Sequence, residues 1–260
     1  MGRPEVEALR PRVWFRGKGE VLLSAADGEP AVAPEAWARE AVERAEDVFG
    51  MRPQGVVVGR LPGEDGAEAP EGGIWGTYRE LVGSGSRWGA VAGRALGLLN
   101  WRRNNRFCGR CGAPMEEHPV ELVARRCTAC GAVVWPDVSP AVIVRVEKEG
   151  KILLARHAYR DREVWACIAG HVDTGETAEE CVRREVREET GLEVDGIRYR
   201  GSQHWPFPNQ LMLAFTARWV SGEIRVQEEE LLEAGWHDPR ALPRTPGKGS
   251  VAWKLIHGEL

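Results

Sequence analysis

Three glutamates that are close in the sequence have the spacing of a shared site. Glu185, Glu188 and Glu189 lie in the segment 184–192, which reads REVREETGL. On a helix, at about 100° per residue, they fall within roughly one third of the circumference. Cys181 and Val182 share this face. The opposite face carries the charged residues Glu179, Glu180, Arg183 and Arg187. The three glutamates therefore continue the inward-facing stripe of the predicted helix.

Carboxylates on the inward side of a helix need a counter-charge. A run of charges is usually a solvated face, but here the solvated face is already filled by other charged residues. Three clustered carboxylates repel one another and lose hydration, and Arg184 alone is insufficient to balance them. Magnesium or manganese is the natural partner of such oxygen ligands. Next to the glycine-rich loop 170–176, the cluster favours phosphoryl chemistry.

Four of the six cysteines form two tight pairs. These are the CGRC and CTAC segments, with Cys108, Cys111, Cys127 and Cys130. Gly112 and Gly131 follow the pairs and let the backbone curl behind a bound ion. The pattern predicts a structural zinc site with four thiolates, in preference to two disulfides or a redox pair. Cys167 and Cys181 lie in apolar patterns and are expected to be small buried hydrophobic residues.

The segment from Gly170 to Leu192 resembles the Nudix box, G-x5-E-x7-R-E-U-x-E-E-x-G-U with U apolar, at every defined position. The resemblance implies the Nudix fold, a mixed sheet between helices, and hydrolysis of a nucleoside diphosphate linked to another moiety. It also implies that the three glutamates bind the catalytic metal ions, while Glu176 and Arg184 shape the loop and orient the helix. Two further metal ligands implied by the family are the Ala169 carbonyl and Glu230, which is alternatively the water-activating base. The neighbouring Glu228, Glu229 and Glu233 are alternatives to Glu230.

A second segment is similar to one branch of this family, the NADH pyrophosphatases. Residues 202–212 read SQHWPFPNQLM, close to the branch signature S-Q-P-W-P-F-P-x-S-L-M, and the branch also has a four-cysteine ribbon before the Nudix domain. The prolines are expected to hold the segment extended, so that Trp205 and Phe207 project to one side as a wall for a flat ring. The resemblance also implies that the loop 247–252 closes over the substrate.

The resemblance implies a set of substrate-binding residues: Trp135, His171, Gln203, His204, Trp205, Pro206, Phe207, Pro208, Asn209, Gln210 and Ala252. Four of these depart from the branch pattern. His171 replaces a phenylalanine, His204 a proline, Gln210 a serine and Trp135 a tyrosine. The resemblance further implies a homodimer in which Trp135 reaches the neighbouring subunit's site.

These residues predict hydrolysis of the NADH or NAD pyrophosphate to nicotinamide mononucleotide and AMP, with Glu230 or Glu189 activating water. An alternative is removal of the NAD cap from RNA, motivated by arginines around the ribbon. These are Arg102, Arg103, Arg106, Arg110, Arg125 and Arg126. ADP-ribose or a dinucleoside polyphosphate is a further alternative substrate. An inactive hydrolase domain that senses a nucleotide is an alternative of another class, which a broken box would favour.

The chain that positions these residues has 260 residues, of which 43% are hydrophobic and 28% charged, as in an ordinary globular protein. We expect three parts: an α+β domain over 1–104, the zinc ribbon over 105–135 and the α+β Nudix domain over 136–260. The net charge of −4 argues against a generally basic surface. No run spans a bilayer and no signal peptide is recognised, so we expect a cytoplasmic protein.

Hydrophobic periodicity places the main elements. In the last part we expect strands over 141–144, 152–155 and 164–169, then a helix over 177–190 that ends at Gly191. Further strands are expected over 197–199, 211–218 and 223–226, with a helix over 251–256. In the first part the pattern predicts a hairpin over 13–23 and a helix over 34–49.

Overall fold

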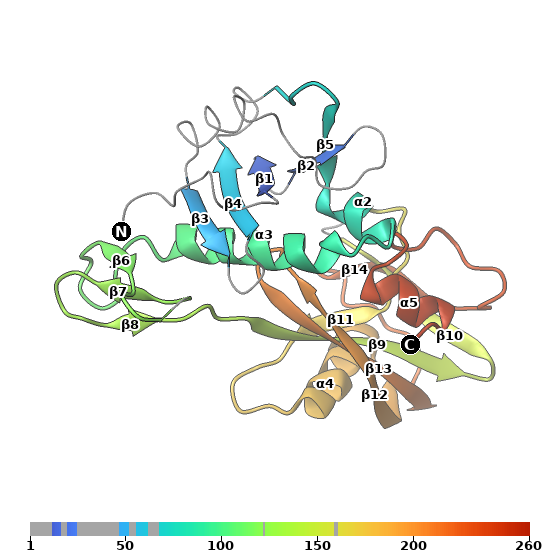
Figure 1. Cartoon of the computed structure of the whole chain (residues 1–260). Coiled ribbons are helices and arrows are strands. Elements are labelled where there is room, and N and C mark those ends of the chain that lie inside the picture. The colour runs from blue at the N-terminus through green and yellow to red at the C-terminus, as the bar shows by residue number, and fades with distance from the viewer. Residues whose placement is uncertain are drawn as a thin grey trace. The chain divides into compact units, whose positions relative to one another are not determined.

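The computed structural model describes residues 12–16, 20–24, 47–51, 56–61, 68–121, 123–158 and 161–260. The chain divides into two compact units (Figure 1). Unit 1 contains Met1–Asp137 with Pro206–Asn209, and unit 2 contains Val138–Trp205 with Gln210–Leu260. The three-part division at 104 and 135 stays a prediction. Within the described residues no helix has the length and apolar character needed to cross a membrane.

The described part of unit 1 begins with a sheet in the order β3-β4-β1-β2-β5. Its strands are β1 Arg12–Arg16, β2 Glu20–Ser24, β3 Asp47–Met51, β4 Val56–Leu61 and β5 Gly73–Thr77. Two helices follow, α2 Tyr78–Gly83 and α3 Trp88–Asn104. The predicted hairpin is confirmed by the antiparallel pairing of β1 with β2. Residues 34–46 of the predicted helix lie outside the described residues, whereas 47–49 belong to β3, so the predicted helix end is wrong.

A three-stranded sheet follows α3 and carries the four paired cysteines. It consists of β6 Met115–Glu117, β7 Arg125–Cys127 and β8 Val133–Val134, in that order. Its small core contains Cys108, Met115 and Cys127. So small a core cannot stabilise a sheet alone, which agrees with a bound metal as the main source of its stability.

Unit 2 is built on one mixed sheet in the order β12-β13-β9-β10-β14, with β11 pairing β9. The strands are β9 Ser139–Lys148, β10 Lys151–His157, β11 Ile168–His171, β12 Glu193–Trp205, β13 Gln210–Ser221 and β14 Leu231–His237. The helices are α4 Ala178–Thr190 and α5 Val251–His257. The parallel pairing of β13 with β9 and the antiparallel pairing of the other strands give the mixed α+β sheet that was predicted for this part of the chain.

Alternate residues of β9 enter two different cores. Val142, Val144 and Val146 pack with the apolar side of α4, whereas Ile143 packs with Leu255 and Ile256 of α5. Because successive side chains of a strand point to opposite faces, the two helices cover opposite faces of this sheet (Figure 1).

Two strand predictions in unit 2 need correction. The strand predicted over 164–169 begins only at Ile168, and the segment 223–226 is not a strand. That segment lies instead against the end of α4, where the Arg225 amide donates to the Thr190 carbonyl at 2.9 Å. Its backbone is satisfied by a helix end and not by a strand, so its apolar alternation misled the prediction.

Candidate active site and zinc site

The acidic helix α4 forms as predicted because its ends are well defined. At the start, Thr177 and Glu180 form a capping box, in which the Thr177 hydroxyl accepts from the Glu180 amide at 3.2 Å. At the end, Gly191 has a φ of 72°, which glycine adopts without steric cost. Arg183 and Arg187 are exposed, whereas Cys181, Val182 and Val186 are buried. The predicted orientation of the helix is therefore confirmed.

The three box glutamates differ in their exposure. Glu189 is buried, with 4% of its surface exposed, and the Glu185 side chain is 13% exposed. Glu188 is exposed, with 54% of its side chain accessible, so the prediction that it continues the inward-facing stripe is wrong for this residue, which lies at the edge of the helix face. Burial raises the pKa of Glu185 above its ordinary value, even though Arg184 acts to lower it. A second cation beside Glu185 would therefore stabilise its ionised form, which burial disfavours.

Arg184 joins the loop before the helix to the helix itself. Its guanidinium binds Glu176 through two bonds, from Nε to Oε1 at 2.8 Å and from Nη2 to Oε2 at 2.9 Å. Its Nη1 donates to Glu185 Oε1 at 2.8 Å and to Glu188 Oε2 at 3.0 Å. Nη2 also donates to the His171 carbonyl at 2.9 Å. One side chain thus holds β11, the loop and two of the box glutamates together.

The charge of Arg184 has a clear effect on Glu176. The hydrogen bond from Arg184 is the largest cause that lowers the pKa of Glu176 to about 2. Glu176 Oε2 also accepts from the Asp173 amide at 3.0 Å, which closes the loop. Glu176 and Arg184 therefore shape the loop and orient the helix, as the family resemblance implied.

Gly170 lets the Glu185 carboxylate lie directly against β11. A Cβ atom at this position would come within 2.0 Å of Glu185 Cδ and Oε1. The neighbouring Ala169 is half-buried in the same strand, which pairs with Ile143 of β9. The Glu185 carboxylate therefore lies beside the backbone of β11, and carboxylate and main-chain carbonyl oxygens are both ligands that suit a hard divalent cation.

The loop that carries Glu230 is anchored to the end of α4. The Gln227 amide donates to the Glu189 carbonyl at 3.1 Å, and the Glu230 amide donates to the Gln227 carbonyl at 3.0 Å. Glu230 is half-buried. The backbone thus connects Glu230 to Glu189.

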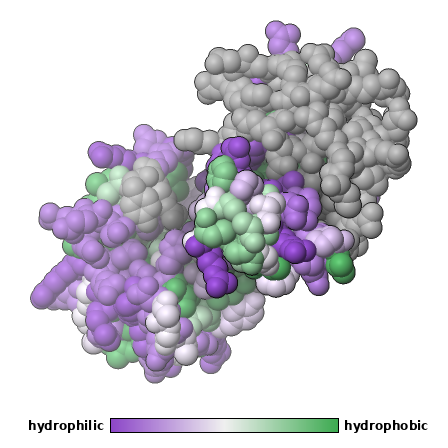
Figure 2. Space-filling view, turned by 90° about the vertical axis from the view of Figure 1, so that its left-hand side faces the viewer, coloured by the Kyte–Doolittle hydropathy of each residue, from purple (hydrophilic) through white to green (hydrophobic). Residues whose placement is uncertain are grey.

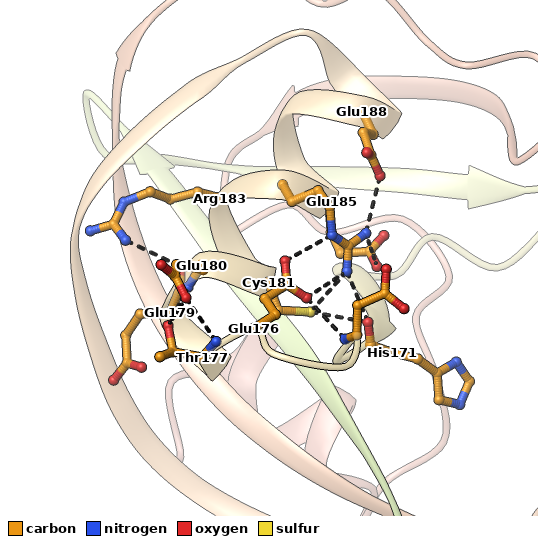
Figure 3. Close-up of polar contacts among 11 residues, drawn as sticks. His171, Glu176, Thr177, Glu179, Glu180, Cys181, Arg183, Glu185 and Glu188 are labelled. Carbon is orange, nitrogen blue, oxygen red and sulfur yellow. Dashed lines mark hydrogen bonds and ion pairs between the residues drawn. The ribbon is translucent and has the colours of Figure 1, made fainter.

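Two residues that depart from the branch pattern contact each other. The Gln210 side-chain amide donates to His171 Nε2 at 2.8 Å, from the start of β13 to the end of β11. Both strands pair with β9, where Ala141 faces His171 and Ser139 faces Gln210. The His171 ring points away from the Arg184 cluster (Figure 3). The two replacements therefore form one hydrogen-bonded pair.

Gln203 has both ends of its amide occupied by the backbone of one loop. Its Nε2 donates to the Gly249 carbonyl at 3.2 Å, and its Oε1 accepts from the Val251 amide at 2.7 Å. Gln203 therefore holds the predicted substrate loop in place. Ala252 lies in the first turn of α5, half-buried beside the core under that helix, and not in the loop.

The aromatic and proline segment differs from its prediction. It is not extended throughout, because β12 ends at Trp205 and residues 206–209 form a turn that leads into Gln210. Phe207 packs edge-on against Tyr78, with ring centroids 5.8 Å apart. His204 and Trp205 are half-buried at the end of β12. The predicted flat wall of Trp205 and Phe207 therefore depended on an extended backbone that the hairpin does not have.

The turn is also held through its backbone. Asn100 Nδ2 donates to the Pro206 and Pro208 carbonyls, each at 3.0 Å, and Asn209 Nδ2 donates to the Asp137 carbonyl. Sequence reasoning missed Asn100, because its side chain acts on residues more than a hundred positions away. Trp135, the remaining predicted substrate residue, is 57% exposed.

The four paired cysteines converge as predicted. Their sulfur atoms all lie within 4.8 Å of one another. The Cys108 and Cys130 sulfurs are 3.7 Å apart, and the Cys111 and Cys127 sulfurs are 3.4 Å apart. A tetrahedral zinc ion with bonds of about 2.3 Å needs sulfur separations of about 3.8 Å, so the site fits zinc. Among the described residues this is the one group of three or more such side chains gathered this closely, and the box glutamates are farther apart.

The two cysteine pairs have equivalent backbones. The Cys108 amide donates to the Ala113 carbonyl and the Cys127 amide to the Ala132 carbonyl, each at 2.8 Å. Gly112 and Gly131 have φ values of 75° and 71°, which confirms why glycine follows each pair. Backbone N–H groups of Cys130 and Ala129 lower the pKa of the Cys127 thiol to about 6, which favours the thiolate that zinc needs.

The other two cysteines are buried, as predicted, and burial raises the pKa of both the Cys167 and the Cys181 thiol to about 12. The surface around these cores is mainly hydrophilic on the face drawn in Figure 2, with apolar side chains in smaller groups.

Comparison with known proteins agrees with this geometry. The NUDIX domain family matches residues 136–257, and the NADH pyrophosphatase zinc ribbon domain family matches residues 103–134. The proteins named NAD-capped RNA hydrolase NudC from Salmonella heidelberg (strain SL476) and from Salmonella typhi are each 42% identical over 181 residues, 70% of this chain and 70% of the relative. A solved NUDIX hydrolase from Nitrosomonas europaea is 24% identical, with a TM-score of 0.48, over 53% of this chain and 80% of that one.

The fold and the complete box thus define a Nudix hydrolase. Within that family, the chain belongs to the branch that carries the NADH pyrophosphatase zinc ribbon.

Proposed function

We propose that the protein hydrolyses the pyrophosphate bond of NADH or NAD and releases nicotinamide mononucleotide and AMP. The observation that carries the proposal is the complete Nudix box, held on α4 against β11 by Arg184, in a chain with the NADH pyrophosphatase ribbon. The NudC relatives are named NAD-capped RNA hydrolases, and an NAD cap contains the same pyrophosphate bond as NAD.

The residues at the box fit a divalent cation. Glu185, Glu188, Glu189, Glu230 and the Ala169 carbonyl would hold magnesium or manganese, since carboxylate and carbonyl oxygens suit both ions. The space beside Gly170, which a Cβ atom would fill, brings the Glu185 carboxylate to the backbone of β11. A bound ion supplies neutralisation of the phosphate charge and a lower pKa for water.

The chain's own residues have separate roles in this proposal. Glu189 or Glu230 accepts the proton of the attacking water. Glu189 suits this role because it is buried, and burial raises the affinity of a carboxylate for a proton. Arg184 keeps the helix and the loop in register. The His171 and Gln210 pair, with Trp205 nearby in the sequence, borders the nucleotide, and Gln203 orders the loop that lies over it.

The test is product analysis with purified protein, NADH and either magnesium or manganese. We expect mononucleotide and AMP in equal amounts, and a kcat/KM reduced about a hundredfold or more in Glu189→Gln. The matched control is Glu179→Gln, which changes an exposed glutamate of the same helix and should leave kcat/KM within about twofold. Equal activity of Glu189→Gln and wild type would contradict the proposal.

Removal of the NAD cap from RNA is the second candidate function. The arginines around the ribbon divide into two groups. Arg102 is bound to Glu117 at 2.7 Å, and Arg125 donates to backbone carbonyls, so both support the fold. The exposed group is Arg103, Arg106, Arg110 and Arg126. Phe107 lies among these residues with 62% of its surface exposed, and an aromatic ring between arginines suits a stacked base and its phosphates.

Comparison of kcat/KM on NAD-capped RNA and on NADH at one fixed salt concentration separates the two functions. A preference for the RNA that disappears in Phe107→Ala supports cap removal. If kcat/KM were equal for NAD-capped RNA and NADH, in the wild type and in Phe107→Ala alike, the ribbon would not carry a dedicated RNA surface. We also propose that the protein is a homodimer, in which Trp135 of each subunit reaches the site of its neighbour, and that it is cytoplasmic. Light scattering of the purified protein tests the dimer.

A further inference from the structure

Arginines from three neighbouring strands meet on the α5 side of the sheet in unit 2. The register pairs Arg198 of β12 with Thr216 of β13, and Thr216 with Arg145 of β9. Two residues further along β13, Arg218 faces Glu147 of β9. Val144, Val146, Phe215 and Ala217 alternate with these residues and enter the core under α4. The polar side chains therefore share the opposite face, beyond the end of α5.

The arginines line two adjoining hollows. One has a volume of about 260 Å³ and is lined by Arg145, Arg198 and Arg200 with the chain after α5. The other, of about 230 Å³, is lined by Arg198 and Arg218. Glu147, Arg198 and Thr216 belong to both hollows, so they form one groove, which we call the arginine groove.

Two arginines of this groove are available for a ligand. Arg145 is bound to Glu147 at 3.1 Å and to the Leu255 carbonyl, and Arg200 donates to the Leu260 carbonyl. Within the part of the chain that the structure describes, Arg198 and Arg218 take part in no ion pair or side-chain hydrogen bond. Both are exposed. The side chains that line the groove include four arginines and one glutamate, so positive side chains are in excess.

Gly196 helps to place Arg218 in the groove. A Cβ atom at Gly196 would come within 2.7 Å of Arg218 Nε, so the arginine lies directly over the backbone of β12. Gly196 has a φ of 62° at a point where the pairing of β12 with β13 shifts register. This local irregularity brings Arg218 to the same hollow as Arg198.

We propose that the arginine groove binds the phosphate backbone of the RNA that follows an NAD cap. The inference rests on the cap-removing function proposed above. An arginine fork matches phosphate geometry, and the hollows are lined mainly by charged and polar side chains, which do not suit an apolar ligand. Charge complementarity therefore favours a polyanion, and the hydrolase activity favours RNA.

The groove lies away from the box, which makes the proposal specific. His171 pairs with Ala141 of β9, whereas the groove reaches Glu147, six residues further along that strand. At about 3.3 Å per residue this separation is about 20 Å along one face of the sheet, whereas the box helix α4 covers the opposite face. At a rise of about 3.4 Å per nucleotide, a stacked strand needs about six nucleotides to cover it. NADH and very short capped RNAs are too short to extend from His171 to Arg218, which faces Glu147 at the far end of the groove.

The test compares Arg198→Gln/Arg218→Gln with the wild type on three substrates: NADH, a capped dinucleotide and a capped RNA of 20 nucleotides. We expect KM to rise about fivefold for the long RNA alone, with the other two substrates within about twofold. The slope of log KM against log salt should fall by about 1.4, from two lost phosphate contacts. The control is Arg162→Gln/Arg183→Gln, which removes the same charge from exposed positions elsewhere in unit 2.

Binding of the labelled long RNA, measured by fluorescence anisotropy, tests the groove independently of turnover. A dissociation constant about fivefold weaker in Arg198→Gln/Arg218→Gln, but not in the control, supports the proposal. Equal binding by the two proteins, or an equal KM increase for NADH, overturns it. Failure of the proposed function is a separate result, because it appears as absence of mononucleotide release from NADH by the wild type.

Discussion

Gly170→Ala is the most direct test of how the site is assembled. The added Cβ atom would lie 2.0 Å from Glu185 Cδ, whereas carbon atoms in contact are separated by about 3.5 to 4.0 Å. The Glu185 carboxylate must therefore retreat by about 1.5 Å. Because a displacement of about 1 Å can cost about a hundredfold in rate, we expect kcat/KM for NADH to fall about a hundredfold.

The same geometry predicts little change in stability. The displaced atoms are the far end of a flexible side chain, and Gly170 does not have a positive φ. We expect the free energy of unfolding to change by about 1 kcal/mol or less, measured by urea denaturation. The control is Gly235→Ala, where the nearest atom to a new Cβ is His237 Nε2 at an ordinary 3.5 Å. Its kcat/KM should stay within about twofold of wild type.

A double-mutant cycle shows whether the effect of Gly170→Ala passes through Glu185. If Glu185 is the residue displaced, Gly170→Ala should cost much less in a Glu185→Gln background than in the wild type. A full hundredfold loss in that background would refute the reasoning, as would unchanged activity of Gly170→Ala itself.

Three further predictions concern the positions that organise the two sites. Arg184→Lys should lower the free energy of unfolding, measured in urea, by about 2 to 3 kcal/mol, because one ammonium group cannot replace the bonds to three glutamates. The control Arg187→Lys, on the solvent face, should lower it by less than about 0.5 kcal/mol. Equal losses in the two variants would contradict the role of Arg184. The Glu176 pKa is lowered to about 2, so the difference in free energy of unfolding between wild type and Glu176→Gln should have its largest value above about pH 4.5 and shrink as the pH falls towards 2. A difference that does not change with pH would exclude the ion pair with Arg184 as its cause. Metal analysis should find one zinc per chain, lost in Cys127→Ser and retained in Cys167→Ala; zinc retained in Cys127→Ser would exclude the four-thiolate site.

The sequence alone was sufficient for the local features of this protein. Helix α4, its stop at Gly191 and the outward position of Arg183 and Arg187 follow from periodicity and capping, which act within a few residues. The convergence of the four cysteines follows in the same way from two tight turns, each with its own glycine. Family resemblance added the roles of the box residues, which residue spacing alone does not supply.

The tertiary structure decided what depends on pairing between distant segments. The box spacing could not show that Glu189 is buried while Glu188 is exposed, because exposure depends on how β11 and the loop 225–231 pack on α4. The contact of His171 with Gln210 and the clamp of Gln203 on the loop before α5 arise from strand register. The arginine groove exists only because β12, β13 and β9 lie side by side, so that arginines more than fifty positions apart share one face.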